Sequence, residues 1–341
     1  MGHTIALTFE DGVTRFVETR AGETVAEASY RAGINIPMDC GNGACGTCKC
    51  RVEAGAFDPG NYIEDALSGA EAAQGLGLAC QIVPESDMAI AIAASSAACN
   101  VKPQHFQTAL RSLTRLSETA MMFAIDTPAG FSFLPGQYMT FRVPGTSMQR
   151  SYSFASAPGQ ATLSFLIRDI PAGLMSGWLR GAAVGDVLDV DGPVGSFYLR
   201  DIRRPMLFLA GGTGLAPFLS MLDSIAETGT PYPIHMVYGV TNDTDLVEVA
   251  SLAAYAARID GFTFSTCVAA PGSDHPHNGY VTDHLAPAAL NGGDVDVYLC
   301  GPPAMVDAVG AWLRQRGVTP ANFYYEKFAP SGATAPDRVA A

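Results

Sequence analysis

The first twenty residues alternate between apolar and polar side chains. Two such runs, at residues 4–9 and 13–19, flank an Asp-Gly pair. Alternation with a period of two is typical of a half-buried strand, and Asp-Gly favours a tight turn. The pattern therefore predicts a β-hairpin.

A helix is expected directly after this hairpin. Thr24 and Glu27 have the S/T-x-x-E spacing of a capping box, and Gly33 stands where a helix commonly ends. The small apolar residues Val25 and Ala28 supply the buried face of this helix.

The middle of the chain contains short apolar runs with turn residues between them. Runs of this length and spacing predict a six-stranded antiparallel barrel. The expected strands are residues 106–113, 120–125, 137–143, 151–156, 162–167 and 187–190, and the small residues at 93–100 are expected to form a linker before them.

The last third alternates between apolar strands and amphipathic helices, which is typical of a doubly wound parallel sheet. The expected strands are residues 206–210, 234–238, 262–268, 295–300 and 322–328, and the expected helices are 218–226, 246–257 and 304–314. We therefore expect domains at residues 1–97, 98–202 and 203–328, followed by a disordered tail at 329–341.

The charge of the chain is strongly acidic. Its formal net charge is −13, and the first hundred residues hold 5 Lys or Arg against 13 Asp or Glu. This balance argues against binding to nucleic acid or to an anionic membrane, and it suits docking of the first domain on a basic partner. No apolar run approaches the ~20 residues that cross a bilayer, and we expect a cytoplasmic protein.

The cysteines point to a metal cluster. Cys40, Cys45 and Cys48 have C-x4-C-x2-C spacing, and Cys80 follows 32 positions later. This is the plant-type 2Fe-2S spacing, whereas a structural zinc site usually shows two close pairs. Cys50 lies two residues beyond a ligand and is interpreted as a packing residue.

The stretch Arg150, Ser151, Tyr152, Ser153 has the chemistry of a flavin site. The guanidinium suits a pyrophosphate, the phenol can pack against an isoalloxazine, and Ser153 can reach its N5 edge. Further on, Arg168, Met175 and Ser176 are assigned to the same site, because a helix opened by Ser176 would direct main-chain N–H groups at a phosphate.

A glycine-rich turn after the strand at 206–210 predicts a dinucleotide site. Its residues are Gly211, Gly212, Thr213 and Gly214, and a helix follows, so that the backbone can approach a pyrophosphate. Cys300, Gly301 and Pro302 end another parallel strand, where a thiol is expected to face the ligand crevice and touch a nicotinamide.

The second strand of this domain is expected to select the nucleotide. Asp243 and Asp245 follow it, and no Lys or Arg lies between Arg204 and Arg258 to hold a 2′-phosphate. NADH is therefore favoured over NADPH. The nearby pair His275 and His277 lacks a third ligand and is interpreted as part of a solvated loop.

Taken in order, these stretches resemble the reductase components of benzoate, toluate and anthranilate 1,2-dioxygenases, in the ferredoxin–NADP reductase superfamily. The resemblance covers residues 4–328 and includes "INIPMDC", "RSYSF", "LAGGTGLAPFLSML", "GGDVDVYLCGPPAMV" and "ANFYYEKF". It implies a β-grasp 2Fe-2S ferredoxin domain, an FAD-binding barrel and an NADH domain. It also implies an oxidoreductase of aromatic hydrocarbon catabolism that passes electrons from NADH through FAD and 2Fe-2S to a Rieske-type oxygenase.

Matching residues carry the family roles to this chain. The resemblance implies Ser153, Thr213 and Cys300 as catalytic residues and the four spaced cysteines as cluster ligands. Phe328, at the end of the last expected strand, is expected to cover the flavin ring, although this chain continues for 13 residues beyond the point where such chains tend to end. Two alternatives stay open at this point. One is the reductase component of a diiron monooxygenase of phenol or methane type, and the other is a redox sensor that turns nothing over.

Overall fold

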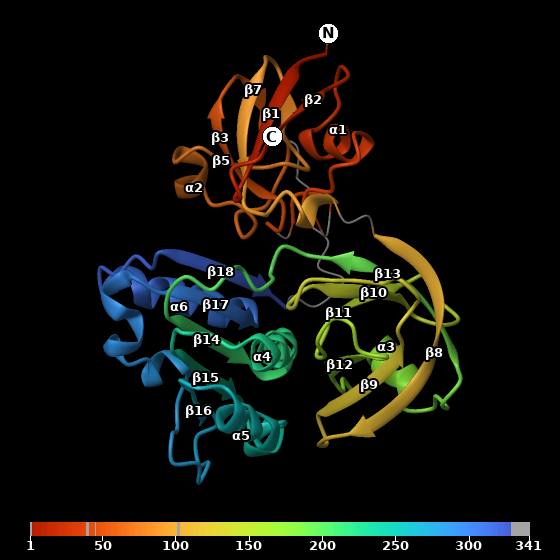
Figure 1. Cartoon of the computed structure of the whole chain (residues 1–341), viewed down its shortest axis with the longest axis vertical. Coiled ribbons are helices and arrows are strands. Elements are labelled where there is room, and N and C mark those ends of the chain that lie inside the picture. The colour runs from red at the N-terminus through yellow and green to blue at the C-terminus, as the bar shows by residue number, and fades with distance from the viewer. Residues whose placement is uncertain (1, 39–40, 45, 101–102, 329–341) are drawn as a thin grey trace. The chain divides into compact units, whose positions relative to one another are not determined.

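The computed structural model describes residues 2–38, 41–44, 46–100 and 103–328. Cys40, Cys45 and the tail at 329–341, which was expected to be disordered, lie outside these residues. The described chain divides into two compact units, residues 2–104 with 193–196 and residues 105–192 with 197–328 (Figure 1).

The first unit is built on a mixed five-stranded sheet in the order β2-β1-β7-β3-β5. Its main strands are β1 (Thr4–Phe9), β2 (Thr14–Glu18), β3 (Lys49–Ala54), β5 (Leu76–Leu78) and β7 (Met88–Ile92). Helices α1 (Val25–Arg31) and α2 (Gly69–Ala73), the small pair β4 (Phe57–Asp58) and β6 (Val83–Pro84), and the 3-10 turn η1 (Ala98–Asn100) complete the unit.

Local sequence signals account for the start of this unit. The predicted hairpin is confirmed, with Gly12 in the left-handed region at φ +77°. The capping box is also confirmed, because the Thr24 hydroxyl accepts from Glu27 N and the Glu27 carboxylate accepts from Thr24 N. The expected linker is wrong in part, since Ala94 and Cys99 are buried in the core of the unit.

The second unit begins with the expected six-stranded antiparallel barrel, in the order β11-β10-β13-β8-β9-β12. A single bridge between Phe154 and Phe165 brings its end strands together, so the barrel is nearly closed. Its strands are β8 (Gln104–Arg115), β9 (Ala120–Asp126), β10 (Tyr138–Arg142), β11 (Gln149–Ser153), β12 (Thr162–Arg168) and β13 (Val187–Val194).

Several boundaries in the barrel differ from the prediction, and two of these differences concern the predicted flavin site. Strand β11 begins at Gln149, because Gln149 still pairs with Arg142 of β10. Helix α3 (Leu174–Leu179) begins two residues before Ser176, with Gly173 at its N-cap. Ser176 is therefore the third residue of the helix rather than the residue that opens it.

The remainder of the second unit is the predicted parallel sheet, and its strand order is β16-β15-β14-β17-β18. Its strands are β14 (Met206–Gly211), β15 (Ile234–Val240), β16 (Phe262–Val268), β17 (Asp296–Gly301) and β18 (Asn322–Lys327). Its helices are α4 (Ala216–Thr228), α5 (Val249–Arg258) and α6 (Pro303–Gln315), with the 3-10 turns η2 (Gly212–Leu215), η3 (Asp243–Asp245), η4 (Val281–His284) and η5 (Pro287–Gly293).

Successive residues of β14 show that the sheet is covered on both faces. Phe208 belongs to the core cluster that includes residues of α4 and α5, whereas Leu207 and Leu209 belong to the cluster that includes residues of α6. This alternation is what a doubly wound sheet requires.

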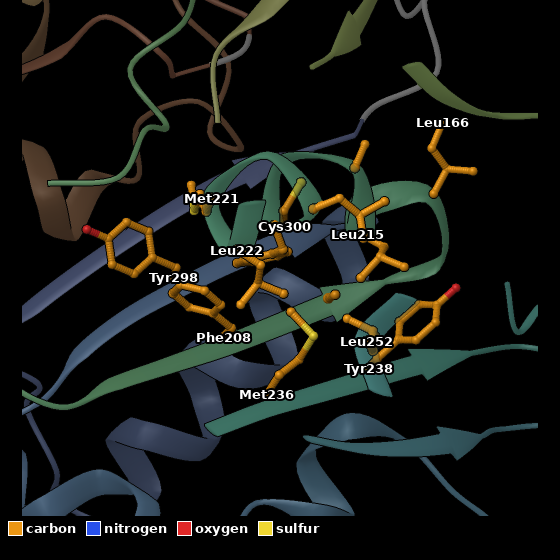
Figure 2. Close-up of a cluster of buried hydrophobic side chains, with 14 of the residues drawn as sticks. Leu166, Phe208, Leu215, Met221, Leu222, Met236, Tyr238, Leu252, Tyr298 and Cys300 are labelled. Atoms are coloured by element: carbon orange, nitrogen blue, oxygen red, sulfur yellow. The ribbon is translucent and has the colours of Figure 1, made fainter. Parts of the chain in front are cut away.

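The barrel and the parallel sheet share one of these cores. Leu166 of β12 is 2% exposed and lies in the same cluster as Phe208, Met236 and Leu252 (Figure 2). A shared hydrophobic core resists relative motion of the two domains. No helix among the described residues is both long enough and apolar enough to span a bilayer.

We predict that Leu166→Ala destabilises the second unit as a whole. Truncation of a fully buried leucine typically costs about 2–5 kcal/mol of unfolding free energy. Urea unfolding should show a lower midpoint, while Leu174→Ala, at a side chain that is 42% exposed, should leave the midpoint nearly unchanged. An unchanged midpoint for Leu166→Ala would show that the core is not shared.

Candidate functional site

Strand pairing explains how cysteines that are distant in sequence come together. Cys48 precedes β3 and Cys80 follows β5, and Lys49 pairs with Leu78 across these two strands. The main chain continues this contact, because Ala79 N donates to Cys48 O at 3.0 Å. Both cysteines are buried, at 2% and 6% exposure, so the ladder places two of the four predicted ligands beside each other.

The glycines between the predicted ligands lie where no side chain fits. A Cβ on Gly43 would lie 2.3 Å from Asn61 O, and one on Gly46 would lie 2.7 Å from Ala66 O. Both glycines also adopt positive φ, at +76° and +77°. The loop is therefore pressed against residues 61–66, and its backbone can wrap closely around a small group such as a 2Fe-2S cluster.

Cys50 lies in the core rather than in the loop. It is 2% exposed, and its thiol donates to Gly77 O at 3.5 Å. Burial, with a smaller contribution from Cys80, raises the pKa of Cys50 to about 12. These observations agree with its interpretation as a packing residue.

The flavin stretch forms β11, the end strand of the barrel. Tyr152 pairs with Met139 and packs against the rings of Phe123 and Phe141, with centroid distances of 6.1 and 5.8 Å. Burial raises the pKa of Tyr152 to about 12, although Arg150 acts in the opposite direction. Period-two alternation puts Arg150 on the same side of the strand as Tyr152.

The neighbouring hydroxyls lie on the other side of β11. The hydroxyls of Ser151 and Thr140 are 3.0 Å apart, and Ser151 is exposed. Ser153 is 3% exposed and directs its hydroxyl toward the parallel sheet. Arg150 and Tyr152 therefore lie on one face of β11, and the Ser151 and Ser153 hydroxyls lie on the other.

The remaining residues assigned to the flavin lie at the end of β12 and in α3. Arg168 is the last residue of β12 and is exposed. Met175 is 1% exposed within the barrel core, so only its main-chain N–H can face a ligand. The Ser176 hydroxyl accepts from Ile170 N and donates to Ile170 O, which fixes the loop before the helix.

The glycine turn after β14 is formed by close backbone approach. A Cβ on Gly211 would lie 2.5 Å from Met305 Sδ, and one on Gly214 would lie 2.4 Å from Cys300 O. Gly212 has φ +56° with open space around it, and half-buried Thr213 follows in η2. The turn is therefore packed on the end of β17 on one side and open at Gly212 on the other.

Three reactive side chains from separate strands meet where the barrel adjoins the parallel sheet. The Ser153 hydroxyl of β11 donates to Glu326 Oε2 at 3.3 Å. Cys300 Sγ of β17 lies 3.8 Å from the same Glu326 oxygen, and the two residues are register partners in β17 and β18. Glu326 was not among the residues predicted for the site. Its position at the end of a strand rich in aromatic residues could have indicated it as a candidate.

Cys300 is placed at the predicted strand end, but its side chain is not open to solvent. It is 0% exposed and belongs to the core shown in Figure 2. Its pKa is raised well above the ordinary value, first by burial and then by the charge and hydrogen bond of Glu326. The neutral thiol is therefore the form present.

Phe328 and Pro302 lie beside this group at the end of the sheet. Phe328 N donates to Gly301 O at 2.9 Å, and its half-buried side chain packs against the core shared with the barrel. Pro302 is the N-cap of α6 and is exposed.

The acidic turn after β15, expected to have no basic residue near it, lies close to a basic residue of the barrel. Asp243 accepts from the Ser273 hydroxyl at 2.7 Å, and Asp245 accepts from Asn242 N at 3.0 Å and from the Thr119 hydroxyl of the barrel. Burial raises the pKa of Asp245, but these hydrogen bonds and the nearby Arg168 together lower it. A basic residue therefore does approach this turn, from the other domain.

The histidine loop is held by internal hydrogen bonds. His277 Nδ1 lies 3.1 Å from Thr266 O, and His275 Nδ1 lies 3.1 Å from His277 N. His284 also lies close, with its ring centroid 5.3 Å from that of His277. In the part of the chain that the structure describes, three or more His, Cys, Asp or Glu side chains do not gather into a metal-binding group.

Three family models match the chain in succession. Residues 8–85 match the 2Fe-2S iron–sulfur cluster binding domain, residues 107–198 the oxidoreductase FAD-binding domain, and residues 208–310 the oxidoreductase NAD-binding domain. The chain thus carries domains for all three expected cofactors.

Full-length relatives identify the family. The toluate 1,2-dioxygenase electron transfer component of Pseudomonas putida is 53% identical over 97% of this chain and 100% of its own length. The 2-halobenzoate 1,2-dioxygenase component of Burkholderia cepacia is 48% identical over 97% and 99%, and the anthranilate 1,2-dioxygenase component of Acinetobacter baylyi is 39% identical over 97% and 98%. The chain belongs to this family of electron transfer components.

Solved structures agree with the fold of this electron transfer component. The crystal structure of the Amycolatopsis cytochrome P450 reductase GcoB is 30% identical, with a TM-score of 0.72 over 96% of this chain and 99% of that chain. The ferredoxin reductase in carbazole 1,9a-dioxygenase, at 23% identity and a TM-score of 0.66, shows the same fold over 96% and 99%. The chain is an oxidoreductase of NADH, FAD and 2Fe-2S type.

The packing of Gly43 leads to a direct prediction for cluster assembly. Gly43→Ala should lose most of the bound iron, because the new Cβ meets Asn61 O at 2.3 Å. Gly12→Ala is the matched control, since Gly12 has nearly the same φ, +77°, with no atom within 4 Å of the added Cβ. Both variants carry the strain of a positive φ, so the difference between them in iron content and visible absorbance measures the effect of the steric clash alone. Equal iron in the two variants would contradict the close packing of the loop.

Proposed function

We propose that this chain takes hydride from NADH and supplies electrons, through FAD and a 2Fe-2S cluster, to the Rieske-type oxygenase component of a benzoate-type aromatic-ring 1,2-dioxygenase. The observation that carries the proposal is the shared carboxylate of Glu326. It contacts Ser153 of the barrel and Cys300 of the parallel sheet, so that one group joins the flavin side to the nicotinamide side.

The barrel residues would hold the flavin. When bound, FAD supplies the step that accepts a hydride and releases electrons singly. Arg150 would bind its pyrophosphate, Tyr152 would pack against the isoalloxazine, and the Ser153 hydroxyl would lie at its N5 edge. Further contacts are assigned to the Ser151 hydroxyl, to Arg168, and to the main-chain N–H groups of Met175 and Ser176.

The parallel sheet would hold the nicotinamide nucleotide. The turn at Gly211, Gly212, Thr213 and Gly214 would bind the pyrophosphate by its backbone, because the open side of Gly212 admits a phosphate. Cys300, with Gly301 and Pro302 after it, would border the nicotinamide, and Phe328 would cover the flavin ring. Ser153, Thr213 and Cys300 are the proposed catalytic residues, and Glu326 joins them as the group that orients Ser153 and Cys300.

The first domain would hold the cluster through Cys40, Cys45, Cys48 and Cys80. The contact between the Cys48 and Cys80 segments and the tight fit of Gly43 and Gly46 support this ligand set. We propose the boundaries 1–97, 98–202 and 203–328 for the three domains and a cytoplasmic location, since thiolate ligands suit a reducing compartment.

The relatives support the choice of partner. The components of toluate, 2-halobenzoate and anthranilate 1,2-dioxygenases are 39–53% identical to this chain, whereas the propane 2-monooxygenase reductase component of Rhodococcus jostii is 33% identical. A dioxygenase partner is therefore favoured over a diiron monooxygenase. The acidic first hundred residues suit a basic docking surface on that partner.

The choice of partner can be tested by reconstitution. The purified chain with NADH should support ring dihydroxylation by a toluate- or benzoate-type Rieske oxygenase at a far higher rate than hydroxylation by a diiron monooxygenase. Coupled product formation is the measurement, with cytochrome c reduction as the control for an active reductase. Equal coupling to both oxygenases would contradict the proposed partner.

Ser153→Ala should slow the reduction of FAD by NADH. Loss of the hydroxyl at the N5 edge removes a hydrogen bond from the reacting atoms, and we expect a decrease of about tenfold or more. Stopped-flow absorbance of the flavin measures the rate. Ser220→Ala is the control and should leave the rate unchanged, since Ser220 is fully buried and its Oγ has no hydrogen-bond partner among the described residues.

Cys45→Ser should stop electron exit and leave flavin reduction intact. Loss of one ligand removes or disables the cluster, while the FAD domain is untouched. Reduction of cytochrome c and of the flavin should be measured separately. Cys50→Ser, which changes a packing residue of the same domain, should retain both activities, and equal behaviour of the two variants would refute the ligand assignment.

A further inference from the structure

We propose that Gln81 is a positioning residue that raises the reduction potential of the cluster through a hydrogen bond to Cys80. The inference rests on the proposed role of Cys80 as a ligand. Gln81 Nε2 donates to Cys80 Sγ at 3.5 Å, to Cys80 O at 3.0 Å and to Gly41 O at 3.2 Å. A side-chain amide thus faces the sulfur of a predicted ligand.

The surroundings determine which end of the amide faces the sulfur. Gly41 O and Cys80 O are both acceptors, so the nitrogen is favoured at this position and the oxygen would be repelled. The two N–H groups are shared among three acceptors, and one of these acceptors is the sulfur. The orientation therefore follows from the chemistry of the neighbours.

The backbone of Gln81 is held firmly in place. Gln81 N donates to Leu78 O at 2.8 Å, and Ile82 N donates to the same oxygen at 2.9 Å. Gly60 packs against this turn so closely that an added Cβ would lie 2.5 Å from Gln81 O and 3.1 Å from Gln81 Cβ. A side chain that leaves so fixed a turn can hold its amide at the sulfur with little loss of entropy.

The contact to Gly41 gives the amide a second role. Gly41 directly follows the predicted ligand Cys40, and Gln81 directly follows Cys80. The amide therefore links the loop that carries the first three predicted ligands to the turn that carries the fourth. Outer contacts of this kind orient the ligands of a metal site and tune it.

The direction of the effect follows from electrostatics. Reduction adds one negative charge to a cluster held by thiolates, and an N–H dipole directed at a sulfur stabilises that charge. Removal of the donor should lower the potential. Reduction of the cluster by the flavin would then be less favourable.

The test is a redox titration of the full-length protein, followed by electron paramagnetic resonance of the reduced cluster. Gln81→Met keeps the length and neutrality of the side chain but lacks the N–H donor. At the midpoint potential of the wild-type cluster, its ratio of reduced to oxidised cluster should fall about 2- to 10-fold, as expected for one hydrogen bond. Gln74→Met, at an exposed position of the same domain, should leave this ratio unchanged.

A second variant keeps the inference testable if Gln81→Met fails to assemble the cluster. Gln81→Lys retains N–H donors and should keep the cluster with a potential at or above that of the wild type. A Lys variant below the wild type, or a Met variant with a full cluster at the wild-type potential, would overturn the inference. Failure of the ligand assignment is seen separately, because Cys80→Ser would then keep an unaltered paramagnetic signal.

Discussion

The placement of the two nucleotide sites depends on the core that the flavin barrel shares with the parallel sheet. Hydride transfer requires the donor and acceptor atoms to lie within about 3–3.5 Å of each other. The two domains that bind the two cofactors must therefore keep a fixed relative position. Leu166, Ala120 and Phe197 from the barrel side lie in the same buried cluster as Phe208 and Tyr298 of the sheet. The two domains are therefore held together mainly by the burial of apolar side chains in one common core.

Hydrogen bonds between the barrel and the parallel-sheet domain then fix how the two domains are oriented. Asp223 of α4 accepts from Ala157 N at 3.2 Å and from Gln160 Nε2 at 2.7 Å, both in the barrel. Asp245 also accepts from the hydroxyl of Thr119, another barrel residue. With the domains fixed in this way, Ser153 and Cys300 reach a single carboxylate although they belong to different domains.

The parts of the structure that were predictable are those that depend on local chemistry. The capping box of α1, the Asp-Gly hairpin and the alternation of strands and helices each depend on residues close in sequence. The cysteine spacing indicated the cluster domain for the same reason. The start of α3 was missed because Gly173 supplies the N-cap without a side chain, whereas Ser176 has the residue type usually found there.

The parts that were not predictable depend on tertiary register. Glu326 reaches Cys300 only because β18 pairs with β17 in parallel, and no local pattern encodes that pairing. The charge of Arg168, in the barrel, helps to lower the pKa of Asp245, so counting basic residues within the nicotinamide domain alone could not find this influence. Cys300 is buried by the shared core, although its place at a strand end favoured an open crevice.

The measurement that tests the relay most directly is an anaerobic titration of the purified protein with NADH, followed by visible absorbance and electron paramagnetic resonance. The account predicts uptake of about three electrons per chain, two for FAD and one for the cluster, with a rhombic 2Fe-2S signal. Uptake of about two electrons, with no paramagnetic cluster signal, would contradict it, because the cysteines would then hold no active cluster.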